Sequence, residues 1–316
     1  MPDLFVTNDT DANGFYLNRG DGTFKSFSGP SGLSTTDGSM GIALGDFNKD
    51  GLTDVIYSNY AAEVNTLATL IDNTSSNDGK LRNAVFVHDF ESPLLHKLTW
   101  PKVSWAPGLF DLDNDTDLDL FFANGHLNSV SGDNRQANLL FENDGGGRFS
   151  DISDKSGVLS TGKRIHRSAI FADYDDDGRV DIFVTVNGQQ VEDGKGNNVF
   201  DPNQGKGILF HNDTKNNNNW LKVRLEGTKS NRDGLGSKVK IKSGAFTDEK
   251  ALVSGEGYFS SSAKEIYFGL GETTSIDKLT VLWPSGHDDI FENIKANQTV
   301  YIVEGKQLYQ DTLRSP

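Results

Sequence analysis

The chain of 316 residues has no cysteine, no long apolar run and no basic stripe. Without cysteine it can form neither a disulfide framework nor a thiolate metal site. No run of about eighteen apolar residues occurs, so we expect no membrane-spanning helix. The formal net charge is −15 and the lysines and arginines are scattered. We therefore expect no nucleic-acid partner, since phosphates require a basic surface.

Familiar catalytic patterns are missing as well. Neither HExxH nor GxSxG occurs, and the six histidines form no pair with metal-ligand spacing. We also expect no signal peptide within this chain, because Met1 leads directly into strand-like sequence. If the protein is extracellular or periplasmic, its signal lies outside this chain.

Three nine-residue stretches share one sequence pattern: DFNKDGLTD (46–54), DLDNDTDLD (111–119) and DYDDDGRVD (173–181). Each has an oxygen-bearing side chain at positions one, three, five and nine, and position seven offers its backbone carbonyl. Ca2+ prefers six to eight oxygen ligands in flexible geometry. The sequence therefore predicts about three Ca2+ ions. Their predicted ligands are Asp46, Asn48, Asp50, Leu52 (carbonyl) and Asp54; Asp111, Asp113, Asp115, Asp117 (carbonyl) and Asp119; and Asp173, Asp175, Asp177, Arg179 (carbonyl) and Asp181.

The residues around these loops identify the kind of motif. An EF-hand loop has twelve residues, ends in a bidentate Glu and leads into a helix. Here the loops are followed by VIYSN, LFFAN and IFVTV, which read as short strands. The alternative is a surface turn that is merely rich in Asp and Asn. Three copies in register favour a strand, calcium loop, strand unit.

The loops start 65 and 62 residues apart, a period that indicates repeated structural units. An aromatic-plus-Asn segment recurs after each post-loop strand, as in FYLNRGDGTF (15–24) and LLFENDGGGRF (139–149). PDLFVTN (2–8) matches the post-loop strands, so Asp3 corresponds to position nine of a loop whose other residues are missing. We expect that the chain begins inside a repeat and is a fragment of a longer protein.

This repeated pattern of acidic loop and short strands resembles the FG-GAP/VCBS repeats of integrin-α-type β-propellers. Further along, SNRDGLGSKVKI (230–241), SGEGYFSSS (254–262) and LTVLWPSG (279–286) resemble an ASPIC/UnbV domain. Such repeats followed by that domain are the arrangement of the cartilage acidic protein family and its bacterial relatives. The resemblance implies an all-β fold, calcium and a secreted setting. Thr116 departs from the pattern, which usually has Gly there, and Asn48 replaces an Asp, which predicts that the first loop is the weakest site.

We expect propeller-type repeats, one partial and three full, over 1–215. A small β-sandwich-like domain should follow over 219–305, with strands in LKVRLEG, SKVKIKS, KALVSG, EIYFGLG, KLTVLWP, HDDIFENI and TVYIVEG, and a loose tail over 306–316. About four blades are fewer than the seven that this repeat family usually builds. Closure by strands of the 219–304 region, or self-association, would then protect the open edges.

Two functions stay open at this point. The first is a calcium-stabilised extracellular module that binds protein or carbohydrate. The second is a lyase or cyclase with its site at the propeller mouth and calcium as a structural ion or Lewis acid. His126 and His166 could lie on one ligand-binding face, although such residues more often satisfy loop backbone. Trp100, Trp105, Trp220 and Trp283 could stack on sugar rings, although core packing is the commoner role.

Overall fold

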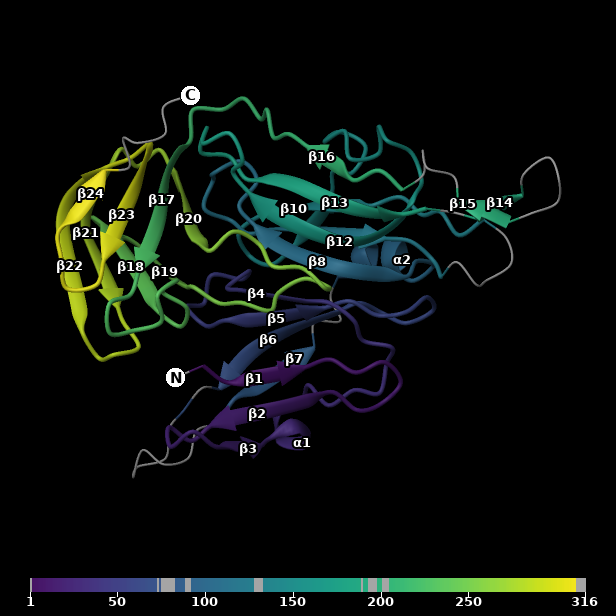
Figure 1. Ribbon diagram of the computed structural model, residues 1–316, viewed down its shortest axis with the longest axis horizontal. Coiled ribbons are helices and arrows are strands. Elements are labelled where there is room, and N and C mark those ends of the chain that lie inside the picture. The colour runs from purple at the N-terminus through teal and green to yellow at the C-terminus, as the bar shows by residue number, and fades with distance from the viewer. Residues whose placement is uncertain are drawn as a thin grey trace.

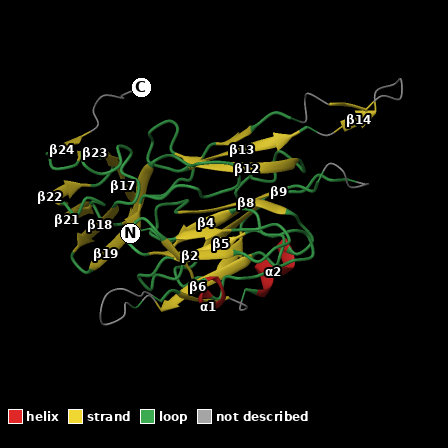
Figure 2. Cartoon of the chain, turned by 60° about the horizontal axis from the view of Figure 1, so that its bottom comes forward, coloured by secondary structure: helices red, strands yellow, loops and turns green. Residues whose placement is uncertain are grey.

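The structure, a computed structural model, describes residues 2–72, 74, 83–88, 92–127, 133–188, 190–192, 198–200 and 205–310. Strands dominate these residues, which confirms the all-β expectation (Figure 2). Only two short helices interrupt them, α1 (Ser28–Ser31) and α2 (Pro93–Thr99). None of the helices in this part of the chain is long and apolar enough to cross a membrane.

The repeat region forms a succession of small antiparallel sheets, one for each repeat (Figure 1). The first has the order β1-β2-β3: β1 (Leu4–Val6), β2 (Gly14–Asn18) and β3 (Phe24–Ser26). The second has the order β4-β5-β6-β7: β4 (Ile42–Gly45), β5 (Asp54–Tyr57), β6 (Thr66–Asp72) and β7 (Val85–His88). Alternate side chains of these two sheets, together with Leu33 after α1, fill one shared apolar cluster that includes Phe15, Tyr57 and Phe86.

The third sheet has the order β11-β10-β9-β8: β8 (Ser104–Phe110), β9 (Asp119–Asn124), β10 (Leu139–Asn143) and β11 (Phe149–Asp151). The fourth has the order β12-β13-β16: β12 (Ile165–Ala172), β13 (Asp181–Asn187) and β16 (Ile208–Phe210). A separate two-stranded ribbon joins β14 (Gln190–Glu192) to β15 (Asn198–Phe200). Strands β4, β8 and β12 start successive sheets and lie next to one another.

Each acidic loop joins the first two strands of its sheet, as expected. The loops close the hairpins β4–β5, β8–β9 and β12–β13, whose last paired residues are Gly45 with Asp54, Phe110 with Asp119, and Ala172 with Asp181. These sheets agree with propeller-type repeats. In Figure 1 the sheets β1–β3 and β12–β13–β16 occupy opposite ends of the repeat region.

The second domain is a sandwich of two four-stranded sheets. One has the order β20-β17-β23-β24: β17 (Asn219–Glu226), β20 (Glu265–Gly271), β23 (Gln298–Val303) and β24 (Leu308–Gln310). The other has the order β19-β18-β21-β22: β18 (Lys238–Ser243), β19 (Phe246–Ala251), β21 (Ser275–Leu282) and β22 (Asp288–Lys295). Alternate residues such as Leu221, Val223 and Leu225 fill its core, because successive strand side chains point to opposite faces.

Two expectations need correction. Residues 308–310, expected in a loose tail, form β24, which pairs antiparallel with β23. The strand expected in KALVSG (250–255) lies earlier, at Phe246–Ala251, because the polar alternation FTDEKA pairs with β18 around a tight turn at Gly244. The rest of the expected tail, 311–316, lies outside the described residues.

The residues between β19 and β20 connect the two domains. This segment, 252–264, leaves the sandwich and crosses the strands β4 and β12 of the repeat region (Figure 1). Gly257 exchanges two backbone hydrogen bonds with Ile42, at 2.7 and 3.2 Å. Ser168 donates to the Tyr258 carbonyl at 2.6 Å. The second domain therefore contacts the repeat region through a loop. Closure by strands of the 219–304 region was one of our two alternatives, and self-association, the other, stays a prediction.

Candidate calcium loops

All three loops have the same backbone frame, built on the aspartate at position one. Asp46 Oδ1 accepts the Asp50 N–H at 3.1 Å, and Oδ2 accepts the Gly51 N–H at 2.8 Å. The same two bonds recur at Asp111 (3.1 and 2.9 Å) and at Asp173 (3.0 and 3.0 Å). Because these bonds fold the chain back within six residues, they turn the side chains of positions one, three and five towards one another.

The frame requires left-handed backbone at positions four and six. At position four φ is 60° for Lys49, 61° for Asn114 and 59° for Asp176. At position six the first and third loops have glycine, whereas the second has Thr116 with φ of 88°. A β-branched residue rarely adopts this conformation. The second loop therefore keeps its fold at a conformational cost.

The aspartate at position nine ties each loop to the third strand of its sheet. Asp54 Oδ1 accepts the Leu70 N–H at 2.9 Å, and Asp119 and Asp181 accept corresponding bonds from residues 143 and 212. Asp3 Oδ1 accepts the Asn18 N–H at 2.8 Å in the same way. Asp3 thus occupies the structural place of position nine, as the repeat alignment predicts.

The predicted carboxylate ligands converge. One oxygen each from Asp111, Asp113 and Asp115 lie within 4.8 Å of one another, and so do those of the corresponding trio Asp173, Asp175 and Asp177. In the first loop Asn48 Oδ1 accepts the Asp50 N–H at 3.1 Å, which keeps the same turn with one carboxylate fewer. Oxygen donors at this spacing suit a hard cation such as Ca2+, so the residues present fit that ion.

Burial gives these carboxylates unusual proton affinities. It raises the pKa of Asp54 and of Asp111 to about 7, and that of Asp119 to about 8. The charges of neighbouring loop aspartates add to this effect. Without a counterion the ionised form is therefore disfavoured, and a bound divalent cation would reverse that preference.

Several cationic side chains already lie beside the loops. Lys49 of the first loop donates to Thr116 Oγ1 of the second at 2.7 Å and pairs with Asp117. In the third loop Arg179 pairs with Asp177. Lys222 from β17 donates to Asp173 Oδ2 at 2.7 Å and is fully buried. Arg224 also pairs with Asp176 of this loop, at 3.2 Å. The third loop thus has three cations that a count of carboxylates omits, so carboxylate number alone does not rank the sites.

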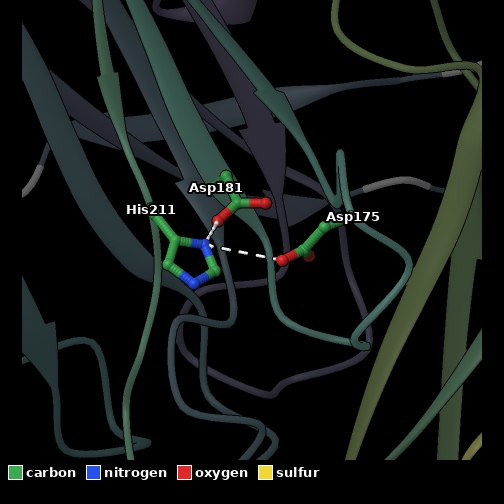
Figure 3. A group of neighbouring side chains, drawn as sticks. All are labelled: Asp175, Asp181 and His211. Atoms are coloured by element: carbon green, nitrogen blue, oxygen red, sulfur yellow. Dashed lines mark hydrogen bonds and ion pairs between the residues drawn. The ribbon is translucent and has the colours of Figure 1, made fainter. Parts of the chain in front are cut away.

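His211 also lies at the third loop, and sequence reasoning missed it (Figure 3). Its Nδ1 is 3.1 Å from Asp181 Oδ1 and 3.8 Å from Asp175 Oδ2. His211 occupies the place in ILFHND that Glu142 occupies in LLFEND. The repeat alignment is therefore the signal that could have found it.

Asparagines of the recurrent aromatic-plus-Asn segments brace the loops. Asn143 Nδ2 donates to the Phe47 carbonyl at 2.8 Å and so joins the third sheet to the first loop. Asn212 Nδ2 donates to the Leu112 carbonyl at 2.7 Å and joins the fourth sheet to the second loop. Each loop of this pair is thus held by the sheet that follows it.

The second domain packs directly on the second and third loops. A Cβ added to Gly269 would lie 1.8 Å from Asp111 Oδ2, and one added to Gly178 would lie 1.9 Å from the Trp220 ring. The Gly271 N–H donates to the Asn114 carbonyl at 2.9 Å. Glycine at 178 and 269 therefore permits this close approach.

The other candidates add no ligand atom to the loops, although Trp220 packs on Gly178 of the third loop. Trp105 and Trp283 are buried, in line with core packing, whereas Trp100 is half exposed and Trp220 lies between the domains. His166 is buried and its Nδ1 donates to the Asn124 carbonyl at 2.9 Å. His126 packs edge-on against Tyr60, with ring centroids 5.4 Å apart. Arg167 donates hydrogen bonds to the carbonyls of both His126 and His166, which shows that these two residues lie near one another, as the expected shared face requires.

Comparisons with known families agree with this architecture. Residues 1–57 and 111–184, which contain all three loops, match the FG-GAP-like repeat, and residues 227–308 match the ASPIC and UnbV family. The chain is therefore a protein of FG-GAP-like repeats with a C-terminal ASPIC/UnbV domain, as the resemblance predicts.

The chain is homologous to cartilage acidic protein 1. It is 28% identical to the protein of Homo sapiens over 323 residues, which cover 99% of this chain and 43% of the human protein. It is 28% identical to the protein of Mus musculus over 290 residues, which cover 90% and 40% of the two chains. It is 27% identical to that of Xenopus tropicalis over 291 residues, with the same coverage. The chain thus spans about two fifths of the length of these relatives.

Proposed function

We propose that this protein is a calcium-stabilised extracellular binding module whose partners are protein or carbohydrate. The observation that carries the proposal is the shared frame of the three loops, each of which gathers oxygen side chains at positions one, three and five. Homology to cartilage acidic protein 1 and the FG-GAP-like repeats support an extracellular setting.

The ions would act mainly on stability. Each ion would be held by the oxygen ligands of one loop. It would neutralise carboxylates whose pKa is raised by burial. Since the second domain packs on two of the loops, the ions would also strengthen the contact between the domains. The binding surface itself would then be presented by a framework that is rigid only with calcium.

Thermal unfolding in EDTA and in millimolar Ca2+ tests this proposal. A ligand at a hundredfold excess over its Kd stabilises the native state by about 2.7 kcal/mol for each site. We expect a higher Tm in calcium, and a smaller gain for Asp111→Asn and Asp173→Asn. Asp288→Asn, an exposed aspartate of β22, is the control and should keep the full gain. An unchanged Tm in calcium would refute the proposal.

A further inference from the structure

We propose that the face of the repeat region opposite the calcium loops binds a sugar that carries a carboxylate, such as a uronic acid. This inference rests on the proposed binding function and names the class of its ligand. The loops follow the ends of β8 and β12, whereas this face lies at the starts of those strands. We call it the Arg167 face, and its residues are Tyr60, Trp105, His126, Arg167, Tyr258 and Phe259.

Arg167 is its central residue. Its Nη1 donates to the carbonyls of Gly125 at 3.1 Å and His166 at 2.8 Å, and its Nη2 donates to that of His126 at 3.0 Å. A guanidinium has five N–H donors. Two of them, on Nε and on Nη2, have no acceptor among the described residues. Nε and Nη2 are neighbours on one edge of the guanidinium, and such an edge can bind both oxygens of a carboxylate.

The charge of Arg167 is also unbalanced. No carboxylate pairs with it in the described part of the chain, although the whole chain has a net charge of −15. Burial lowers the pKa of Arg167 to about 10, so the group stays protonated at neutral pH. A half-buried cation whose partners are only carbonyls gains most from an incoming carboxylate.

Aromatic rings surround this cation. The guanidinium lies 4.1 Å from the Trp105 ring centroid, and the Tyr258 ring lies 4.8 Å from that of Trp105. Phe259 follows, with its ring 4.7 Å from Tyr258, 92% of its surface exposed and φ of 46°. An exposed phenylalanine in left-handed backbone is doubly unfavourable unless it meets a ligand. The negative faces of such rings suit the C–H groups of a sugar ring.

Carboxylates lie on the other side of the face and favour a sugar over a simple acid. A Cβ added to Gly38 would lie 3.0 Å from Tyr60 Cβ and 3.3 Å from both Asp9 Oδ1 and Glu63 Oε2. Glu63 Oε2 already accepts the N–H groups of Gly38 and Tyr60, at 2.8 and 3.2 Å. The other carboxylate oxygens suit hydroxyl donors, which a sugar supplies and a simple alkyl carboxylic acid does not. They would also repel a dense polyanion. A carboxylate, hydroxyls and a C–H face occur together in a uronic acid.

Calorimetric titration of the full chain in millimolar Ca2+ tests the inference. The probes are a galacturonic acid trisaccharide and the same trisaccharide with its carboxyl groups reduced to alcohols. We expect the acidic probe to bind at least about tenfold more tightly, as for a charge-assisted hydrogen bond. Arg167→Gln should abolish this preference, and Phe259→Asn should weaken both probes. Arg148→Gln removes an exposed arginine that pairs with Asp144, and it should change neither affinity.

Melting temperatures of the same samples separate binding from folding. Arg167→Gln loses three hydrogen bonds and could therefore unfold. Phe259→Asn relieves left-handed backbone strain, so this second variant should stay folded and still test the site. Equal affinity for both probes, no binding by the wild type, or unchanged binding by Phe259→Asn would each overturn the inference. Binding of an aspartate tripeptide through Arg167 without binding of the uronate would overturn the sugar assignment. A wild type that melts higher in calcium but binds no uronate refutes this inference alone.

Discussion

At the scale of the residue, Thr116 holds a strained backbone conformation that lowers the stability of the second loop. Its φ of 88° matches those of Gly51 (85°) and Gly178 (86°), and only glycine adopts this conformation freely. The hydroxyl accepts a hydrogen bond from Lys49, but the pair is exposed, so the bond compensates little.

We therefore expect Thr116→Gly to stabilise the protein by about 0.5–1 kcal/mol, since left-handed backbone costs about 1–2 kcal/mol outside glycine and glycine loses part of this in entropy. Chemical denaturation measures the difference. Gly51→Ala is the matched control: a Cβ there meets nothing within 4 Å, so its expected loss of about 1–2 kcal/mol reports conformation alone. A less stable Thr116→Gly would show that the Lys49 contact outweighs the strain.

His166 is a second residue with a predictable effect, this time on pH dependence. Burial lowers its pKa to about 4, the positive charges of Arg164 and Arg167 add to this, and the hydrogen bond to the Asn124 carbonyl opposes it. Unfolded histidine has a pKa of about 6.5. The neutral imidazole therefore contributes stability that is complete above pH of about 6.5 and is lost as the pH falls towards 4.

The contribution amounts to about 3 kcal/mol at most, at about 1.4 kcal/mol for each pKa unit. His166→Gln can still donate to Asn124 but does not titrate. We expect the variant to lose less stability than the wild type between pH of about 6.5 and 4, as followed by urea unfolding at several pH values. Parallel curves for the two proteins would contradict this assignment.

At the scale of the element, β17 connects the domains through one buried cation. Lys222 has no exposed surface and contacts Asp173 at 2.7 Å and Asp176 at 2.5 Å. Burial alone would lower the pKa of Lys222, but the hydrogen bonds to these two carboxylates outweigh it and raise the pKa. Lys222 is thus charged. Its removal takes the buried cation away from Asp173, whereas Asp176 keeps the ion pair with Arg224 at 3.2 Å.

We expect Lys222→Met to destabilise the metal-free protein by about 3–5 kcal/mol, as for one partner lost from a buried ion pair. Calcium should restore part of the loss, because an ion in the third loop supplies positive charge to Asp173. The Tm in EDTA and in calcium measures both effects. Lys238→Met breaks an exposed pair with Glu249, 2.8 Å long, and should cost less than about 1 kcal/mol. Equal effects of the two variants would show that the buried pair has no special role.

At the scale of the whole molecule, the fourth sheet leaves an edge open to association. Within the described residues β16 pairs with β13 alone. Leu209 on β16 and Phe183 on β13 are exposed, at 48% and 40%. An unpaired strand edge beside exposed apolar side chains can pair with another chain.

We accordingly predict that the protein self-associates through β16. A lysine on an edge strand opposes such pairing, so Leu209→Lys should shift the light-scattering mass towards the monomer. Leu94→Lys, at an exposed position of the helix α2 and so on no strand edge, is the control and should leave the mass unchanged. A monomeric wild type, or association that Leu209→Lys does not reduce, would argue against this edge.

The sequence by itself determined the local features of this protein. Alternating oxygen side chains defined the three loops, short β-branched and aromatic runs defined the strands beside them, and the 62–65 residue period defined the repeats. These signals are readable because turn chemistry and strand alternation act between residues close in the chain. The sandwich strands were predicted for the same reason, apart from β24 and the position of β19.

Only the tertiary structure decided how these parts meet. Lys222 reaches Asp173 across 49 residues, and the Leu44 N–H donates to Glu256 across 212. Arg167 likewise became notable only when its carbonyl partners and the ring of Trp105 were placed around it. Such contacts leave no period in the sequence, because they depend on where whole sheets pack and on glycines that allow the approach. The loops could thus be predicted residue by residue, but their cover by the second domain could not.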